Sequence, residues 1–149
     1  MITDKSKILF LDVDGVLNSV RSCYALGGFP HSTGKDDLPL FDNVALGFIR
    51  RLVKETGCEI VLSSTWRLTE PYLQFGNDLK LPVMDRTPCL NKARGHEIQH
   101  WLDNNPWAKY AIVDDDSDML PEQMPYFVKT DVQVGLMTAD FEKLMALLK

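Results

Sequence analysis

Three short apolar runs, each followed at once by a polar residue, divide the chain. They span residues 8–11, 60–62 and 110–113, and apolar residues stand at consecutive positions within each run. The strand predicted from the second run begins at Glu59 and covers residues 59–62. Runs this short that are apolar on both faces are typical of strands buried in a parallel sheet. Weaker runs at residues 82–84 and 126–128 predict two further strands.

Between the runs, apolar positions recur with the period of a helix. The clearest pattern predicts a helix that begins after Asp42 as N-cap and ends at Gly57, with apolar residues at i, i+3, i+4, i+7 and i+8. Glycine and proline residues interrupt the stretch from about 18 to 40, which is therefore predicted to be an irregular flap.

Three more helices are predicted from the same periodicity and from their end signals. They are a helix over residues 69–79 with Thr69 as N-cap, a helix around residues 97–102 that Asn104-Asn105-Pro106 ends, and a C-terminal helix with Thr138 as N-cap.

Strands that alternate with helices predict an α/β fold, a Rossmann-like and mainly parallel sheet flanked by helices. A length of 149 residues suits one domain, so residues 1–149 are predicted to fold together. In such sheets the ligand site lies beyond the carboxyl ends of the strands. The three main strands lead into Asp12, Ser63 and Asp114, and we expect these side chains at one edge.

Composition narrows the class of protein. With a net charge of −5, the chain lacks the broad basic surface of a non-specific nucleic-acid binder. A local basic patch is still compatible with this charge. Three cysteines without a CxxC pair predict reduced thiols instead of disulfides or a zinc site. The chain has neither an apolar leader nor a run long enough to span a membrane, so a cytoplasmic location is expected.

Two groups of carboxylates follow buried strands. Asp12 and Asp14 end the first main strand, and four aspartates lie within residues 114–118. Each group alone could be a polar turn or a solvated acidic loop. Carboxylates brought together at one sheet edge repel each other unless a cation lies between them, and Mg²⁺ suits a site with few protein ligands. The sequence therefore predicts a Mg²⁺ site.

These residues resemble a known family. Phe10-Leu-Asp-Val-Asp-Gly-Val16 is similar to the first motif of the haloacid dehalogenase (HAD) superfamily. The other three motifs follow in the family's order, as Ser63, Arg94-Gly95 and residues 112–118. Residues 64–67, 94–98 with 101–102, and 114–119 further resemble the capless branch found as the HAD domain of Swiss Army Knife RNA repair proteins.

The resemblance implies roles for the acidic residues. Asp12 matches the nucleophile that forms an aspartyl-phosphate, and Asp14 matches the general acid and base. Asp12, Asp14 (through its backbone carbonyl), Asp114 and Asp115 match the metal positions, and it stays open whether Asp114 or Asp115 binds directly.

The resemblance also implies a phosphate-binding set. Ser63 would donate to a phosphoryl oxygen, and Arg94 would neutralise phosphoryl charge where most relatives have lysine. Because Lys92 lies two residues away, it could take the role of Arg94 instead. Ser64, Arg67 and Lys92 are candidates for substrate binding. Arg67 could bind a second phosphate or be exposed to solvent.

The spacing of the motifs leaves no room for a separately folded cap. About 27 residues separate Asp14 from Asp42, and about 30 separate Ser63 from Arg94. An uncapped site would be open and would suit a bulky substrate such as a nucleic-acid end.

The resemblance therefore implies a Mg²⁺-dependent phosphomonoester hydrolase. RNA or DNA ends are the expected substrates, helped by a basic rim of Arg67, Arg86, Lys92 and Arg94. The alternatives are a small-metabolite or phosphoprotein phosphatase and, from another class, a non-catalytic binding module that keeps the metal. Trp66, Trp101 and Trp107 are expected in the core or at its rim and not as platforms for bases.

Overall fold

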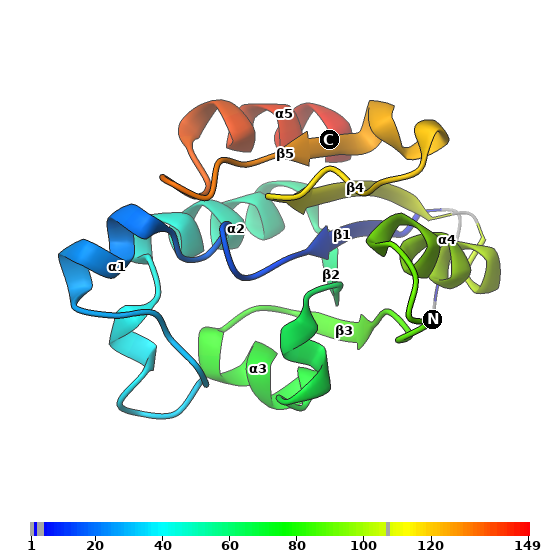
Figure 1. The fold of residues 1–149 in the computed structure, drawn as a ribbon. Coiled ribbons are helices and arrows are strands. Elements are labelled where there is room, and N and C mark those ends of the chain that lie inside the picture. Colours follow the sequence, from blue (N-terminus) through cyan, green and yellow to red (C-terminus); the bar gives the residue numbers. More distant parts are fainter. Residues whose placement is uncertain (1, 3–4, 107) are drawn as a thin grey trace.

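A sheet of five parallel strands forms the centre of the computed structural model, which describes residues 2, 5–106 and 108–149 (Figure 1). The sheet order is β3-β2-β1-β4-β5, and every pairing is parallel. The predicted α/β fold and all five predicted strands are confirmed. The strands are β1 (Lys7–Leu11), β2 (Glu59–Leu62), β3 (Val83–Arg86), β4 (Lys109–Asp114) and β5 (Phe127–Lys129).

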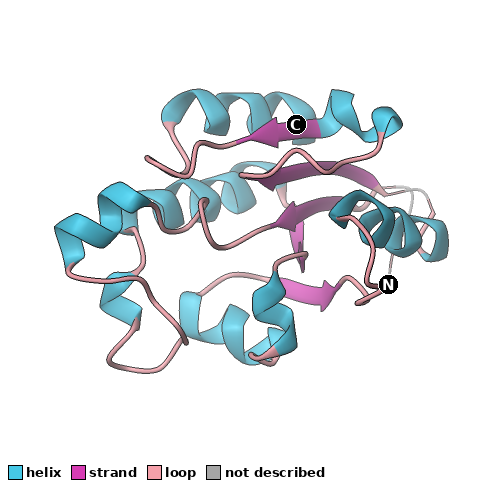
Figure 2. Cartoon of the chain, in the orientation of Figure 1, coloured by secondary structure: helices cyan, strands magenta, loops and turns pink. Residues whose placement is uncertain are grey.

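Helices connect the strands and cover both faces of the sheet (Figure 2). Within the described residues they are α1 (Val20–Leu26), α2 (Asn43–Thr56), α3 (Tyr72–Leu79), α4 (Arg94–Asn104) and α5 (Thr138–Leu148). Shorter 3-10 helices are η1 (Leu38–Leu40), η2 (Thr65–Leu68) and η3 (Pro121–Tyr126).

Successive residues of β1 face opposite sides of the sheet, and both sides are buried. Leu9 and Leu11 pack into a large core with residues of α2, α3 and α5. Ile8 and Phe10 face α4, where Phe10 meets Trp101 edge to face with ring centroids 5.4 Å apart. The molecule therefore has three layers, as expected for strands that are apolar on both faces.

The ends of α2 confirm the prediction made from its pattern. One carboxylate oxygen of Asp42 accepts hydrogen bonds from the N–H groups of Val44 and Ala45. Gly57 ends the helix with φ 73°, in the left-handed region that glycine adopts without strain. Ile49 and other apolar residues of one helix face are buried in the large core.

The flap between β1 and α2 is more regular than predicted, because it contains α1. Ser19 accepts from the N–H of Ser22, and the hydroxyl of Ser22 accepts from the N–H of Ser19. This reciprocal cap starts the helix, and Gly27 ends it in the left-handed region. The prediction of an irregular flap was wrong for residues 20–26.

The helix predicted over residues 69–79 is interrupted near its start. The hydroxyl of Ser64 accepts from the N–H of Trp66 and caps η2, which ends at Thr69. Pro71 then precedes α3 and lacks an N–H to extend η2. Thr69 as N-cap was therefore wrong, because a separate turn uses this residue as its end.

The start of α5 lies one residue from the predicted boundary. Met137 is the N-cap, and Thr138 is already the first helical residue. No side-chain cap hydrogen bond forms at Met137; the carboxylate of Asp140 instead accepts from the N–H of Met137 itself. The prediction of Thr138 as N-cap was therefore wrong, although the acidic Asp140 in the first turn stabilises the N-terminus of the helix.

Two of the three tryptophans confirm their expected core positions. Trp66 packs against Phe41 and Phe75, and Trp101 packs against Phe10. Trp107 lies outside the described residues. The three cysteines are free thiols, as predicted.

The flap lies beyond the carboxyl end of β1, at the left of the molecule in Figure 1. It packs against the rest of the structure, and the described residues include no separately folded insertion after β1 or β2. The carboxyl edge of the sheet is therefore not covered by a cap. No helix in the described part of the chain has the length and apolar character to cross a membrane.

Candidate active site

The hydrogen-bond ladder of the sheet continues one residue past the strands and fixes the polar side chains there. The N–H of Asp12 donates to the carbonyl of Val113, and that of Ser63 donates to the carbonyl of Leu11, each over 3.1 Å. Asp114 ends β4. The structure thus brings Asp12, Ser63 and Asp114 to one edge, as the sequence predicted.

Asp12, Asp114 and Asp115 form a compact group of carboxylates, called the acidic group below. One oxygen of each residue lies within 4.8 Å of the others. Gly15 has φ +81°, and a side chain there would collide with the Asp115 carboxylate. The loop after β1 can approach Asp115 only because position 15 is glycine. Asp114 and Asp115, between which the sequence did not decide, both belong to the group.

Burial makes the acidic group electrostatically unfavourable when it is ionised. Burial raises the pKa of Asp12 to about 9, with a further contribution from the Asp114 carboxylate. Burial also raises the pKa of Asp114, to about 6, although the N–H of Asp116 and the guanidinium of Arg94 oppose the rise. The group therefore needs additional positive charge to be fully ionised near neutral pH.

The acidic group fits a small divalent cation. It offers only oxygen ligands, which Mg²⁺ prefers, and the half-buried Asp115 leaves one side open to water. A divalent charge would counter the repulsion that raises the pKa of Asp12 and Asp114. The carboxylate of Asp14 is not part of this group.

Arg94, the first residue of α4, supplies the positive charge beside the acidic group. Its Nη1 lies 3.4 Å from Oδ2 of Asp114 and 3.8 Å from Oδ1 of Asp12. Its buried Nε has no hydrogen-bond partner but lies 3.7 Å from Oε1 of Glu97. Lys92 is exposed, and within the described residues it makes no ion pair with the acidic group.

Asp14 is oriented by two donors from different parts of the chain. Its Oδ1 accepts from Nδ2 of Asn18 over 2.9 Å and from the indole Nε1 of Trp66 over 3.2 Å. The side-chain Oδ1 of Asn18 also accepts from the N–H of Gly15 over 3.0 Å, which ties the loop to the same side chain. Both donors use the same oxygen, Oδ1.

The two serines at the end of β2 have different surroundings. The Oγ of Ser63 is fully buried and has no hydrogen-bond partner within the described residues. A buried hydroxyl without a partner is unfavourable, so a site that offers one is suited to a polar ligand atom. The hydroxyl of Ser64 instead caps η2, and the backbone carbonyl of Ser64 accepts from Arg67.

Arg67 is buried, contrary to both sequence interpretations of it as a substrate grip or a solvated residue. Its guanidinium donates to three backbone carbonyls, those of Ser64, Thr87 and Pro88. Its Nη2 also lies 3.0 Å from Oε1 of Glu97, and the Arg67 side chain is 2% exposed. These partners use the donors of the guanidinium and hold it inside the protein.

The basic rim expected around the site does not form. Arg67 is buried, and Arg94 faces the acidic group, so only Arg86 and Lys92 of the four are exposed. Asp118, a further candidate metal ligand by its position, instead accepts from the N–H of Arg94 and anchors the start of α4.

Three supporting residues were not found by sequence reasoning. Asn18 and Trp66 hold Asp14, and the hydroxyl of Thr130 donates to the carbonyl of Gly15 over 2.7 Å. Thr130 follows β5, so its place at the carboxyl edge was available as a signal. No sequence signal indicated the hydrogen bond between Trp66 and Asp14, because 52 residues separate them.

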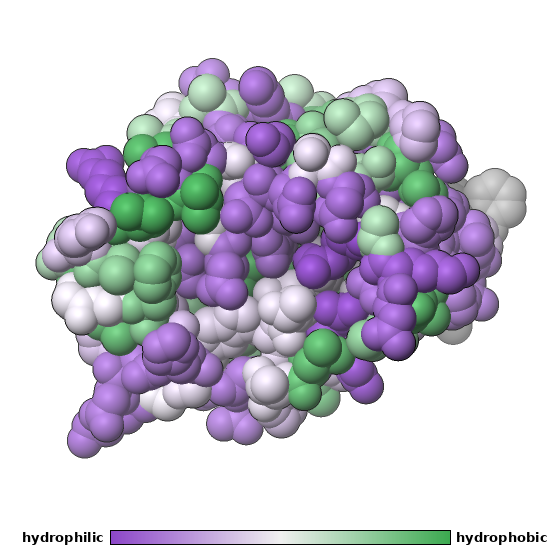
Figure 3. Space-filling model, in the orientation of Figure 1, coloured by the Kyte–Doolittle hydropathy of each residue, from purple (hydrophilic) through white to green (hydrophobic). Residues whose placement is uncertain are grey.

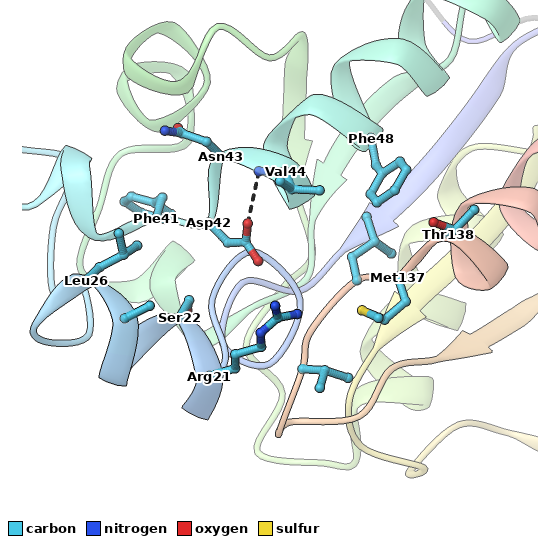
Figure 4. A pocket seen from close by; sticks show the side chains of 13 residues that line it. Arg21, Ser22, Leu26, Phe41, Asp42, Asn43, Val44, Phe48, Met137 and Thr138 are labelled. Atoms are coloured by element: carbon cyan, nitrogen blue, oxygen red, sulfur yellow. Dashed lines mark hydrogen bonds between the residues drawn. The ribbon is translucent and has the colours of Figure 1, made fainter.

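Two hollows lie near the flap, and one of them borders the candidate site. The first, here called the flap hollow, has a volume of about 610 Å³ and is lined by residues from 14–18, 29–31 and 65–69 together with Val132. The second, of about 400 Å³, lies between α1, α2 and the start of α5 (Figure 4). The carboxylate of Asp42 in this second hollow is used to cap α2, and no member of the acidic group lines it.

The fold and the site define a class, an α/β protein with a compact group of carboxylates at the carboxyl edge of a parallel sheet. The family model for the HAD domain in Swiss Army Knife RNA repair proteins matches residues 8–141, and the chain belongs to this family. The resemblance seen in the sequence is thereby confirmed. No curated protein and no solved structure matched the chain.

Proposed function

We propose that this protein is a Mg²⁺-dependent phosphomonoester hydrolase that works through an aspartyl-phosphate on Asp12. The observation that carries the proposal is the buried acidic group with Arg94 as its cationic neighbour. Family membership supports the same chemistry. Asp14, held by two donors beside this group, supports a separate role in proton transfer.

The carboxylates of Asp12, Asp114 and Asp115 would hold the metal ion, with the backbone carbonyl of Asp14 as a further ligand. When bound, Mg²⁺ neutralises the charge of the phosphate ester and of the acidic group. Arg94 adds a second positive charge on the side of α4, and its position within 4 Å of Asp12 and Asp114 supports it over the exposed Lys92 for this role.

In the first step, an oxygen of Asp12 forms a bond to phosphorus while the bond from phosphorus to the leaving oxygen breaks. Asp14, protonated at this stage, gives its proton to the leaving alkoxide so that the alcohol departs neutral. The hydroxyl of Ser63 donates to a phosphoryl oxygen, which provides the partner that this buried Oγ otherwise lacks.

In the second step, water attacks the phosphorus of the aspartyl-phosphate. The carboxylate of Asp14 now accepts a proton from that water, and the bond from phosphorus to Asp12 breaks to release phosphate. Asn18 and Trp66 keep Oδ1 of Asp14 occupied in both steps, so that the same oxygen, Oδ2, gives and takes the proton.

Nucleic-acid ends are the substrate class that we assign to this activity. The family is described from domains of RNA repair proteins, and the absence of a cap over the described sheet edge supports a polymer as substrate. The missing basic rim weakens one argument made from the sequence, because few phosphates of a strand would be contacted.

The test is phosphate release with and without Mg²⁺, from an aryl phosphate, nucleoside monophosphates, and 3′- and 5′-phosphorylated oligonucleotides. We expect Mg²⁺-dependent release that Asp12→Asn abolishes. A phosphopeptide or a sugar phosphate as the best substrate would favour the phosphoprotein or small-metabolite alternative.

The non-catalytic alternative is tested by trapping. A beryllofluoride adduct on Asp12 in a crystal, with a fluorine atom against Ser63 Oγ, is expected for the hydrolase. Bound metal with no adduct, together with equal and negligible turnover by the wild-type and Asp12→Asn proteins, would replace the hydrolase by a binding module.

A further inference from the structure

We infer that the flap hollow binds an uncharged, flat ring on the leaving group of the substrate, which makes a terminal nucleoside the part that the protein recognises. The inference rests on the proposed function, because it concerns the alcohol that departs from phosphorus. It goes further by naming which part of a nucleic-acid end is held and which is not.

The flap hollow is continuous with the candidate active site through Asp14. The Asp14 side chain lines it, and so do its two hydrogen-bond donors, Asn18 and Trp66. Since Asp14 is the proposed acid for the leaving oxygen, the group attached to that oxygen has to lie on this side of the site. The volume of about 610 Å³ falls within the range of sites for small organic ligands.

Three apolar side chains that line the flap hollow remain exposed to water. Phe29, Leu68 and Val132 are 39%, 53% and 44% exposed, and they come from the flap, from η2 and from the segment after β5. Figure 3 shows apolar surface at the α1 end of the molecule beside a hydrophilic area over the middle of the same face. Apolar side chains that converge from three distant segments on one hollow indicate a ligand with an apolar face.

No lysine or arginine is among the described residues that line the flap hollow. A second phosphate close to the leaving oxygen would lie there without a positive partner. The hollow therefore disfavours sugar bisphosphates and gives no grip on the sugar-phosphate backbone of a strand. The charge pattern matches a leaving group whose part inside the hollow is uncharged.

Polar side chains interrupt the apolar lining. Thr65, Thr69 and His31 are exposed there. The Thr69 hydroxyl donates to the carbonyl of Trp66 over 3.4 Å, which leaves it able to accept from a ligand. A nucleoside presents hydroxyls on its sugar and a flat ring beyond them, so a lining that holds both polar side chains and the Phe29 ring matches it in kind. Stacking of a base on an aromatic side chain tolerates any base.

The experiment compares substrates that share a phosphate but differ in the ring. With Mg²⁺ present, kcat/KM is measured for uridine 5′-monophosphate, for ribose 5-phosphate and for a phosphotyrosine peptide, with the wild-type protein and with Phe29→Ala. We expect the wild type to prefer the nucleotide over ribose 5-phosphate by about tenfold or more, and Phe29→Ala to lose most of that preference.

Tyr24→Ala is the matched control. Tyr24 is an aromatic residue of the same flap that is 86% exposed and lines neither hollow. We expect the Tyr24→Ala protein to keep the wild-type preference. A ratio near one in the wild type, an unchanged ratio in Phe29→Ala, or a stronger preference for the phosphotyrosine peptide would each overturn the inference.

A binding measurement separates this inference from the proposed function. Free uridine, which has no phosphate to lose, is titrated into Asp12→Asn protein and into the Asp12→Asn/Phe29→Ala double variant by NMR. Binding that weakens about tenfold in the double variant supports the hollow even if no phosphate is released from any ester. Hydrolysis without uridine binding would keep the hydrolase and reject the nucleoside.

Discussion

The acidic group and the flap hollow meet at Asp14, but they are built in different ways. The acidic group stands on strand ends, where backbone hydrogen bonds between β1 and β4 fix Asp12, and its charges are mostly buried. The flap hollow is formed by side chains of a flap, a 3-10 helix and a loop, and its rim is exposed.

This difference separates two tasks that one site has to perform. Chemistry on phosphorus needs charges held at fixed positions, and a parallel sheet supplies such positions. Recognition of a leaving group needs shape and apolar surface, which loops can change without moving the carboxylates. Changes in the acidic group should therefore remove activity, whereas changes in the hollow should redirect it.

The largest effect is expected for Asp12→Asn. Loss of the proposed nucleophile should lower kcat by roughly 10³-fold or more. The melting temperature of the metal-free protein should stay the same or rise, because one buried negative charge is removed beside Asp114. Activity and thermal unfolding are measured on the same preparation, and activity within tenfold of wild type would reject Asp12 as the nucleophile.

A large loss of stability is expected for Arg67→Met, since it leaves the buried Glu97 carboxylate without its closest cation. Breaking a buried ion pair in this way costs about 3–5 kcal/mol in the free energy of unfolding. Arg86→Met removes an exposed arginine and should change that free energy by less than about 0.5 kcal/mol. Urea unfolding of both proteins checks the pair, and equal losses would show that Arg67 is not a buried partner.

The stability of the metal-free protein should fall as pH rises. The pKa of Asp12 and of Asp114 is raised in the folded state, to about 9 and about 6, above the usual value near 4 of an unfolded chain. Between about pH 4 and pH 9 the folded state thus holds more protons than the unfolded state, so each pH unit lowers the free energy of unfolding.

Mg²⁺ should reverse this trend, because it binds the ionised carboxylates. At a concentration one hundred times its Kd it adds about 2.7 kcal/mol to the free energy of unfolding. Melting temperatures from pH 5 to 9, with chelator or with Mg²⁺, measure both effects. The difference in melting temperature between the Mg²⁺ and chelator curves is expected to increase with pH in the wild type. In Asp12→Asn this difference should be smaller than in the wild type. A difference that is constant with pH would contradict the assignment of the acidic group as the metal site.

The smallest effect is expected for Trp66→Phe, which alters a residue shared by both regions. Phenylalanine keeps a ring beneath the flap hollow but removes the N–H that donates to Asp14. Loss of one hydrogen bond worth about 1 kcal/mol should lower kcat about fivefold and leave the preference for nucleotides in place. The pH profile of kcat should shift as well, whereas a change in KM alone would give Trp66 a role only in the hollow.

The sheet and its carboxyl edge could be predicted because the signals are local. Each strand is a continuous apolar run, and parallel pairing necessarily brings the residues after the runs together. This is how Asp12, Ser63 and Asp114 were found. The short helix α1 was missed because its cap uses Ser22 in place of the usual acidic or amide residue, while the glycines and prolines after it dominate the pattern.

The wrong prediction for Arg67 and the lack of any prediction of the flap hollow have a different cause. An arginine can be buried only where a partner carboxylate is available, and here that partner, Glu97, lies 30 residues away. The hollow likewise depends on how Phe29 and Leu68 approach each other in space. Non-local contacts of this kind leave no periodic signal in a single sequence.

The pair of Arg67 and Glu97 also has a consequence for how this family can diverge. Loss of either residue alone leaves a buried charge without its partner, so a sequence that has changed only one of them folds less stably. The two positions should therefore behave as a single inherited unit, changing together or not at all. Exposed Arg86 carries no such constraint and should drift freely among descendants.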